Sequence, residues 1–148
     1  MLKWNNIMAF ATKGNPIPER RLELSEEEWK ERLSDEDFYI LRQHGTERSF
    51  VGAYCESHEP GIYVCKGCGN DLFDSSIKFE SGTGWPSFTQ PMKENSIKYI
   101  KDTSFGMVRV EIQCNVCDGH LGHVFPDGPA PSKLRYCVNS ASIKLKAS

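Results

Sequence analysis

Residues 107–117, which read MVRVEIQCNVC, combine the two signals that decide the fold. Apolar and polar side chains alternate over Met107–Ile112, which is the period of a β-strand with one buried face. This run leads into the Cys-x-x-Cys pair Cys114–Cys117, just as the strand-like run Ile62–Val64 leads into the pair Cys65–Cys68. The sequence therefore predicts strands that end in metal-binding turns.

The chain after residue 52 continues this pattern. Further short runs of strand character occur at residues 97–100 and 134–145, and clusters of Gly, Pro, Asn and Asp separate them. Short strands joined by frequent turns are typical of antiparallel sheets. The predicted fold is mainly β, built from antiparallel sheets, with no internal repeat.

Helices are expected only near the N-terminus. Ser25 and Glu28 have the spacing of a capping box, which predicts a helix near residues 26–33. A second short helix is expected over about 35–43, with Gly45 at its end. Residues 1–21 contain Asn, Gly and two prolines, and are expected to form an extended or loosely packed lead-in to a single domain over 22–148.

Charge and hydropathy exclude several classes of protein. The 148 residues carry 18 basic and 20 acidic side chains, so no bulk positive field favours nucleic acid. Eight of the acids lie in residues 23–37, as expected of a solvated helix face. No apolar run approaches the roughly 20 residues that a membrane span needs, and the N-terminus lacks the pattern of a secretory signal. We therefore expect a cytoplasmic protein with reduced thiols and no membrane partner.

The two cysteine pairs point to a closed metal site. Four thiolates, from Cys65, Cys68, Cys114 and Cys117, complete a tetrahedral shell with no open position, which is typical of structural rather than catalytic Zn²⁺. A single pair would leave a redox disulfide as a serious rival. The alternatives are therefore structural zinc, which two pairs favour, and two reduced pairs without metal.

Cys137 is the cysteine with the most reactive setting. In Arg135-Tyr136-Cys137-Val138-Asn139, core-facing Tyr136 and Val138 would place a guanidinium, a thiol and an amide on the opposite face. A free cysteine is usually an inert small hydrophobe. A neighbouring cation such as Arg135 can lower the pKa of a thiol and raise its reactivity.

Two histidines follow the second cysteine pair, in the segment His120-Leu121-Gly122-His123. Imidazoles with Asp127 nearby suit proton transfer at neutral pH. They are also possible zinc ligands, although four cysteines already fill a zinc shell. His44 and His58 are expected to be ordinary surface residues.

The segment Ser81-Gly82-Thr83-Gly84-Trp85-Pro86-Ser87-Phe88 places an indole between glycines and a proline. Such a loop can present an aromatic wall to an apolar ligand group. The alternative, with Trp85 as a core side chain at a turn, is about equally good on this segment alone.

Taken together, four motifs resemble the methionine sulfoxide reductase B family: CxxC…CxxC, SGTGWPSF, GHLGHVFPDGP and RYCVNS, in that order. The resemblance extends from about Thr46 to Lys146. It implies a zinc-bearing, mainly antiparallel β fold that reduces the R epimer of methionine sulfoxide in proteins.

The resemblance also implies roles for individual residues. Cys137 would attack the sulfoxide sulfur and become a sulfenic acid, while His120 and His123, with Asp127 nearby, would bind and protonate the departing oxygen. Arg135 and Asn139 would order this polar network. Trp85 would hold the methyl group of the substrate, and Phe125 would form a second wall beside it.

In one respect the chain departs from the family. Many members carry a resolving cysteine where this chain has Thr83, which leaves Cys55 as the unassigned thiol. We hypothesise that Cys55 resolves the sulfenic acid, giving a Cys55–Cys137 disulfide that thioredoxin reduces. The alternative is that another thiol reductant acts on Cys137 directly.

Two rival functions remain at this stage. One is a binding module in which zinc turns support an aromatic cage around Trp85, and it predicts a buried, replaceable Cys137. The other is a zinc-ribbon nucleic-acid binder, which the negative charge and the lack of a basic stripe disfavour.

Overall fold

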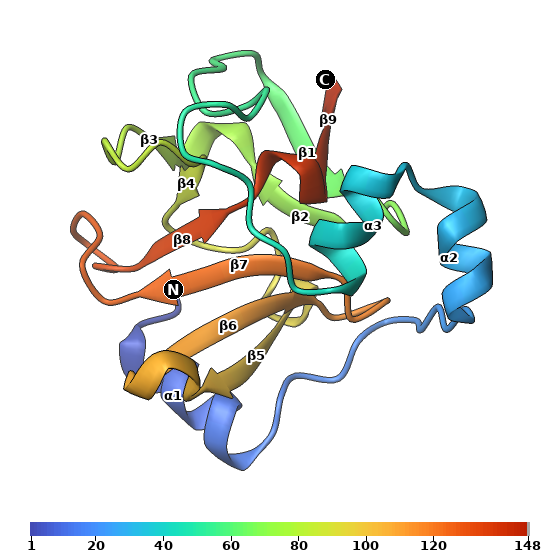
Figure 1. The fold of residues 1–148 in the computed structure, drawn as a ribbon. Coiled ribbons are helices and arrows are strands. Elements are labelled where there is room, and N and C mark those ends of the chain that lie inside the picture. Colours follow the sequence, from blue (N-terminus) through green and yellow to red (C-terminus); the bar gives the residue numbers. More distant parts are fainter. Residues whose placement is uncertain (148) are drawn as a thin grey trace.

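Two antiparallel β-sheets form the centre of the protein, whose computed structural model describes residues 1–147, apart from the side chain of Phe105 (Figure 1). The smaller sheet has the strand order β2-β1-β9, with the bounds Asp71–Asp74, Gly61–Cys65 and Ile143–Ala147. The larger sheet has the order β3-β4-β8-β7-β6-β5, with the bounds Lys78–Phe79, Ser87–Phe88, Arg135–Val138, His120–Phe125, Arg109–Cys114 and Ile97–Asp102. The predicted antiparallel, mainly β fold is confirmed.

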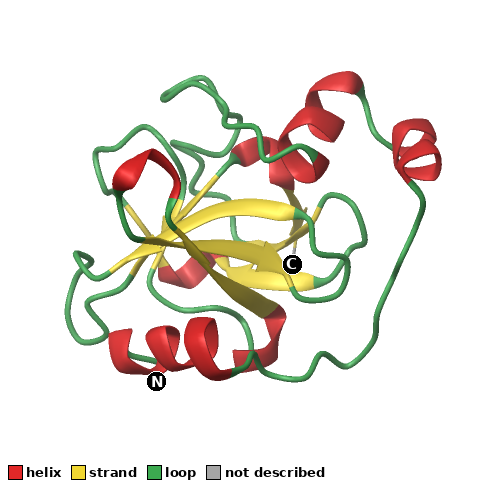
Figure 2. Cartoon of the chain, turned by 60° about the horizontal axis from the view of Figure 1, so that its bottom comes forward, coloured by secondary structure: helices red, strands yellow, loops and turns green. Residues whose placement is uncertain are grey.

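Three α-helices lie outside the sheets: α1 (Trp4–Lys13), α2 (Glu26–Arg32) and α3 (Asp35–Arg42). Figure 2 shows the sheets between α1 on one side and the other two helices on the opposite side. Four single-turn 3₁₀ helices join the strands, at Ser75–Ile77, Glu94–Ser96, Ser104–Gly106 and Ser140–Ser142. No helix among residues 1–147 is long and apolar enough to cross a membrane.

Four aromatic side chains join the two sheets. Phe73 of β2 stacks on Phe88 of β4, with 4.4 Å between the ring centroids. Tyr63 of β1 meets Phe88 edge to face at 5.3 Å, and Tyr136 of β8 meets Phe73 at 5.6 Å. All four are fully buried. Because Tyr136 points into this cluster, its neighbour Cys137 must point to the other face of β8.

The run predicted over residues 134–145 is divided between the two sheets. β8 ends at Val138, a 3₁₀ turn follows, and β9 pairs with β1 instead. Hydrogen bonds fix this crossing: the backbone N–H of Asn139 donates to Leu121 O at 2.9 Å, and Ser142 Oγ donates to His120 O at 2.8 Å. The segment therefore ties the smaller sheet to β7.

The loosely packed lead-in predicted for residues 1–21 is wrong in its local structure, because α1 forms there. Ile7 is fully buried, and Phe10 stacks on Tyr99 of β5 at 5.6 Å. The side chain of Asn15 accepts from Tyr99 N at 2.7 Å and donates to Tyr99 O at 2.9 Å. Residues 1–15 thus cover the outer edge of β5, where an unpaired strand would otherwise be exposed. The division into a lead-in and a domain over 22–148 stays a prediction, and residue 148 lies outside the described residues.

The two helices after residue 25 agree with the prediction to within a residue. Ser25 Oγ accepts from Glu28 N at 3.1 Å, and Glu28 Oε1 accepts from Ser25 N at 3.2 Å, which is the predicted capping box. The second helix ends at Arg42, and Gly45 N closes the turn by donating to Tyr39 O at 3.0 Å.

Candidate functional site

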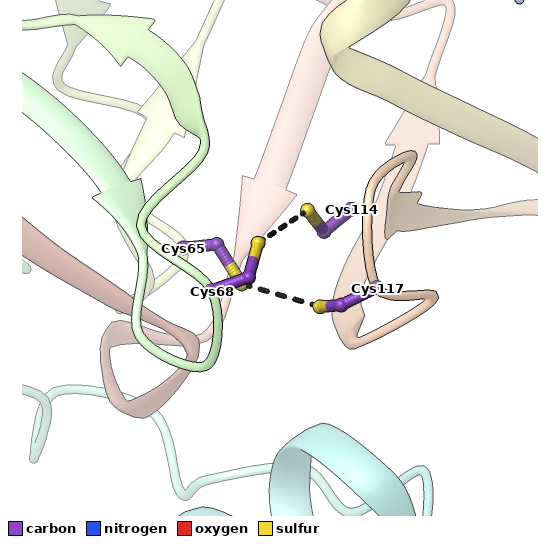
Figure 3. A group of neighbouring side chains, drawn as sticks. All are labelled: Cys65, Cys68, Cys114 and Cys117. Carbon is purple, nitrogen blue, oxygen red and sulfur yellow. Dashed lines mark hydrogen bonds between the residues drawn. The ribbon is translucent and has the colours of Figure 1, made fainter. Parts of the chain in front are cut away.

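Two similar turns bring the four paired cysteines together. Strand β1 ends at Cys65 and β6 ends at Cys114. In each turn the first cysteine's carbonyl accepts a backbone hydrogen bond, from Gly69 N at 2.9 Å and from Asp118 N at 2.8 Å. Figure 3 shows the four side chains pointing at one another from these two turns. The predicted cysteine cluster is therefore formed.

The sulfur positions fit a tetrahedral metal shell. Cys65 Sγ lies 3.7 Å from Cys117 Sγ, Cys68 Sγ lies 3.5 Å from Cys114 Sγ, and all four sulfurs are within 4.8 Å of one another. Zinc–sulfur bonds of about 2.3 Å in a tetrahedron give sulfur–sulfur distances of about 3.8 Å. A disulfide needs about 2.05 Å, so these are free thiols arranged as ligands.

The four thiols of the cluster also interact strongly with one another. Hydrogen bonding among the thiols lowers the pKa of Cys68 and Cys114 and raises that of Cys65 and Cys117. A bound divalent ion would stabilise all four as thiolates.

A cavity of about 640 Å³ lies against the β7–β8 pair of the larger sheet, on the face opposite the aromatic cluster that contains Tyr136. Six of the predicted site residues line it: Cys137, His120, His123, Asn139, Trp85 and Phe125. Its lining does not include three others, namely Cys55, Arg135 and Asp127. We call this space the thiol cavity.

Cys137 lies in the middle of β8, directly opposite His123 of β7 and Ser87 of β4. Tyr136 and Val138 are fully buried while Cys137 is half-buried, which confirms the predicted alternation. Burial raises the pKa of the Cys137 thiol, and the opposing effect of Arg135 is smaller. Arg135 therefore lowers the pKa of Cys137 as predicted, but the net shift of this pKa is upward because the effect of burial is larger.

Arg135 and Asp127 form a pair beside the cavity. Arg135 Nε and Nη2 donate to the two Asp127 oxygens at 2.8 and 3.1 Å. The guanidinium lies over the Phe125 ring, 4.4 Å from its centroid. Asp127 therefore binds Arg135 in this structure, and the histidines use other carboxylates.

His120 is held by Glu111, which the sequence reasoning missed. His120 Nδ1 lies 2.7 Å from Glu111 Oε2, and Gln113 Nε2 donates to the same oxygen at 3.0 Å. Burial raises the pKa of Glu111, but the hydrogen bonds from His120 and Gln113 outweigh it, so the pKa is lowered. An ionised Glu111 keeps a proton on His120 Nδ1, so His120 Nε2 stays available to a ligand in the cavity.

His123 is held by a second carboxylate, Asp102 at the end of β5. His123 Nε2 lies 2.8 Å from Asp102 Oδ2, and Arg109 Nη2 donates to that oxygen at 3.3 Å. Hydrogen bonds from Ser104 and His123 lower the pKa of Asp102. Burial lowers the pKa of His123, and this effect outweighs the opposing hydrogen bond with Asp102.

A β-bulge brings both histidines to one face. Residues three apart in a regular strand point to opposite faces. Between β6 and β7, however, Ile112 pairs with Gly122 and Gln113 pairs with His120, so Leu121 is an extra residue. The bulge reverses the alternation at Leu121, and both His120 and His123 line the thiol cavity.

A loop through Glu47 positions the remaining polar groups. Glu47 O accepts from Trp85 Nε1 at 3.1 Å, and Glu47 N donates to Asn139 Oδ1 at 3.1 Å. Asn139 Nδ2 donates to Leu121 O at 3.2 Å, next to the bulge. Trp85 is therefore a fixed wall of the cavity rather than a core side chain, and Glu47 is another residue that the sequence reasoning missed.

His44 was predicted to be an ordinary surface residue, and it is exposed, but it also lines the thiol cavity. Its Nε2 lies 3.2 Å from Glu111 Oε2, and its ring centroid is 5.2 Å from that of His120. His58 is exposed and pairs with Glu80 at 3.5 Å, as expected of a surface residue.

Cys55 is half-buried, and burial raises the pKa of its thiol. Lys78 Nζ donates to Cys55 O at 3.1 Å, so the loop carrying this cysteine is anchored beside β3. Its pairing with Cys137 stays a prediction.

Comparison with known proteins gives matches over most of the chain. The family model of the SelR domain matches residues 33–147. A peptide methionine sulfoxide reductase MsrB of Saccharophagus degradans is 58% identical over 121 residues, covering 82% of this chain and 90% of the relative. Proteins of the same name from Bradyrhizobium diazoefficiens and Methanosarcina barkeri are 56% and 50% identical, covering 82% and 88% of this chain and 88% and 92% of the relatives.

Gly122 is expected to be required for the close approach of β7 to β8. A Cβ added there would lie 2.0 Å from Cys137 O, whereas one at Gly14, with a similar φ of 151° against 156°, meets no atom within 4 Å. Gly122→Ala should therefore lower the free energy of unfolding in urea by about 1–3 kcal/mol more than Gly14→Ala does. Equal losses would show that the strand contact is not tight.

The charges beside Cys137 should move its reactivity in opposite directions. Arg135 lowers and Asp127 raises the pKa of Cys137. Only the thiolate is alkylated, so Arg135→Gln should slow iodoacetamide modification of Cys137 severalfold at pH 7, and Asp127→Asn should accelerate it. The measurement is the pH profile of the Cys137 peptide by mass spectrometry. Lys133→Gln, at an exposed cation nearby, is the control, and shifts of the same sign in the two variants would contradict the assignment.

Proposed function

The chain belongs to the methionine sulfoxide reductase B family, and on this premise we propose that Cys137 is the nucleophile of its reaction. The activity is the reduction of methionine-R-sulfoxide in proteins to methionine, so the protein is a peptide-methionine (R)-S-oxide reductase. The observation that carries the assignment of Cys137 is its place in one cavity with two carboxylate-held histidines and a fixed indole.

The reaction transfers the sulfoxide oxygen to Cys137. The thiolate attacks the sulfoxide sulfur and forms an S–S bond, while the S–O bond of the substrate breaks and the protonated oxygen departs as hydroxide. This oxygen then attacks Cys137 Sγ, the S–S bond breaks with methionine as the leaving group, and Cys137 becomes a sulfenic acid. The substrate sulfur gains two electrons and Cys137 loses two. The oxygen needs a proton as the S–O bond breaks, because it would otherwise leave as an oxide ion.

The histidines of the cavity are the groups that can deliver this proton. Glu111 keeps one proton on His120 Nδ1, so the proton given to the substrate oxygen is a second one, carried on Nε2. His123 lies opposite Cys137 in the strand pair, and its Nε2 is engaged by Asp102. We therefore assign oxygen binding and protonation chiefly to His120, with His123 and Asn139 ordering the polar side of the cavity.

Aromatic groups are assigned to the methyl group of the substrate. Trp85 is fixed by its hydrogen bond to Glu47 O, and Phe125 is backed by the Arg135 guanidinium. Both line the thiol cavity. A rigid apolar wall beside a polar proton-donating wall matches the two ends of a methyl sulfoxide, and Asp127 supports this wall through Arg135.

The four paired cysteines are proposed to bind structural Zn²⁺. Sulfur spacing of 3.5–3.7 Å and the closed shell suit this ion. Structural zinc binds with roughly 10–16 kcal/mol of apparent free energy, comparable to the stability of a whole domain. In this chain the ion would join β1 of one sheet to β6 of the other.

Regeneration is proposed to use Cys55. The Cys55 thiol attacks the sulfenic sulfur of Cys137, releasing water and leaving a disulfide, which thioredoxin reduces. The two Cα atoms must come within about 7 Å for this bond. Thr83 occupies the position where many family members carry a resolving cysteine, which leaves Cys55 as the remaining thiol of the chain.

Separated epimers test the function directly. With dithiothreitol as reductant, the wild-type protein should reduce blocked methionine-R-sulfoxide and leave the S epimer unchanged. Cys137→Ser should show no turnover above background, because the attacking sulfur is gone. Retained turnover in a folded Cys137→Ser variant would exclude Cys137 as the nucleophile.

The resolving role of Cys55 is tested by one turnover without reductant. Mass spectrometry should find a Cys55–Cys137 disulfide in the wild type and a dimedone-trapped sulfenic acid in Cys55→Ser. The variant should keep turnover with dithiothreitol and lose most of it with thioredoxin. A persistent sulfenic acid and a free Cys55 in the wild type would instead support direct reduction by an external thiol.

A further inference from the structure

A second group of metal-ligand side chains lies in the thiol cavity. Nitrogen atoms of His44 and His120 and an oxygen of Glu111 are all within 4.8 Å of one another. The separations from Glu111 Oε2 are 2.7 Å to His120 Nδ1 and 3.2 Å to His44 Nε2. All three residues line the cavity, which leaves room for water as a further ligand.

The donor spacing suits a transition-metal ion. Bonds of about 2.0–2.2 Å at tetrahedral to right angles place neighbouring donors about 2.8–3.5 Å apart. Two imidazoles and one carboxylate, with open positions, form a donor set that suits zinc. Small adjustments would therefore convert the hydrogen-bonded cluster into a coordination site.

Two of the ligands are rigid and the third is accessible. Glu111 and His120 are buried in the paired strands β6 and β7. His44 lies beyond the end of α3 in the left-handed region, with φ of 57°, and 61% of its side chain is exposed. An ion can thus enter from solvent beside His44 and meet two fixed ligands.

We propose that His44, Glu111 and His120 form a reversible Zn²⁺ site through which excess zinc inhibits the enzyme. Binding replaces the Nδ1 proton of His120, which is released to solvent. The bound ion then holds the cluster and blocks the cavity beside Cys137. The site has fewer ligands than the four-cysteine cluster, and it fills only after that cluster. Inhibition rests on the proposed function, whereas binding itself does not.

A cobalt titration of the zinc-loaded protein tests the binding. Co²⁺ in a nitrogen and oxygen shell gives visible d–d absorption. His44→Ala and Glu111→Gln should weaken Co²⁺ binding at least about tenfold, since loss of even an outer-shell partner costs that much. His58→Ala is the matched control, because this exposed histidine also faces a carboxylate, Glu80. Its affinity for Co²⁺ should equal that of the wild type.

Two results would overturn the site. One is equal Co²⁺ affinity in His44→Ala and the wild type. The other is a titration in which all bound cobalt shows thiolate-to-cobalt charge-transfer bands and displaces an equal amount of zinc, because the cobalt would then occupy the four-cysteine cluster. Binding retained in Cys137→Ser would support the three-residue site, whereas its complete loss there would assign the ion to the thiol instead.

The inhibition is tested by single-turnover methionine formation without added thiol, because thiol reductants chelate zinc. Excess Zn²⁺ should slow the wild type at least about tenfold and leave His44→Ala near its own zinc-free rate. Unchanged wild-type rates despite cobalt binding would refute inhibition alone. Absence of methionine formation even without added zinc would refute the proposed function, and the cobalt titration would still decide the metal site.

Discussion

The register of four neighbouring strands is the constraint on which the rest of the site depends. Ser87, Cys137, His123 and Glu111 lie directly opposite one another across β4, β8, β7 and β6. Opposite residues share a face of the sheet, so this row places the thiol, an imidazole and a carboxylate on one surface. A slip of one residue between β7 and β8 would turn Cys137 toward the aromatic cluster and separate it from both histidines. Gly122 permits the close backbone approach that keeps this register.

The sequence contained the parts of the site that local patterns encode. Alternation around Cys137 predicted its orientation, because that depends on residues adjacent in the chain. The two cysteine pairs predicted their own convergence, because four thiols at this spacing suit one metal ion. The carboxylates were not predictable in this way. Glu111 and Asp102 read as ordinary polar positions of strands, and only the pairing of β5, β6 and β7 brings them to the histidines. The bulge at Leu121 is equally hidden, although without it His120 and His123 would lie on opposite faces.

The helix at residues 4–13 was missed for a different reason. Its short segment contains two asparagines and has no acidic residue in its first turn, so its local signal is weak. Burial of Ile7 in the core and the stacking of Phe10 on Tyr99 stabilise it, and Tyr99 lies in β5, more than 80 residues away in the chain. Tertiary packing thus decides the structure where local preference does not.

The cysteine cluster and the thiol cavity are mechanically connected through β7. Cys117 is followed by Asp118 and Gly119, and β7 begins at His120, so two residues separate the last cysteine from the first histidine. Arg42 of α3 donates to Cys117 O at 2.7 Å, and its guanidinium lies over the Trp29 ring of α2, which anchors the same turn from outside. The position of His120 therefore depends on a turn that the four thiols hold from one side and two helices hold from the other. A metal ion bound by these thiols would contribute to the proposed chemistry in this sense, because it would fix the start of the strand that carries His120 and His123.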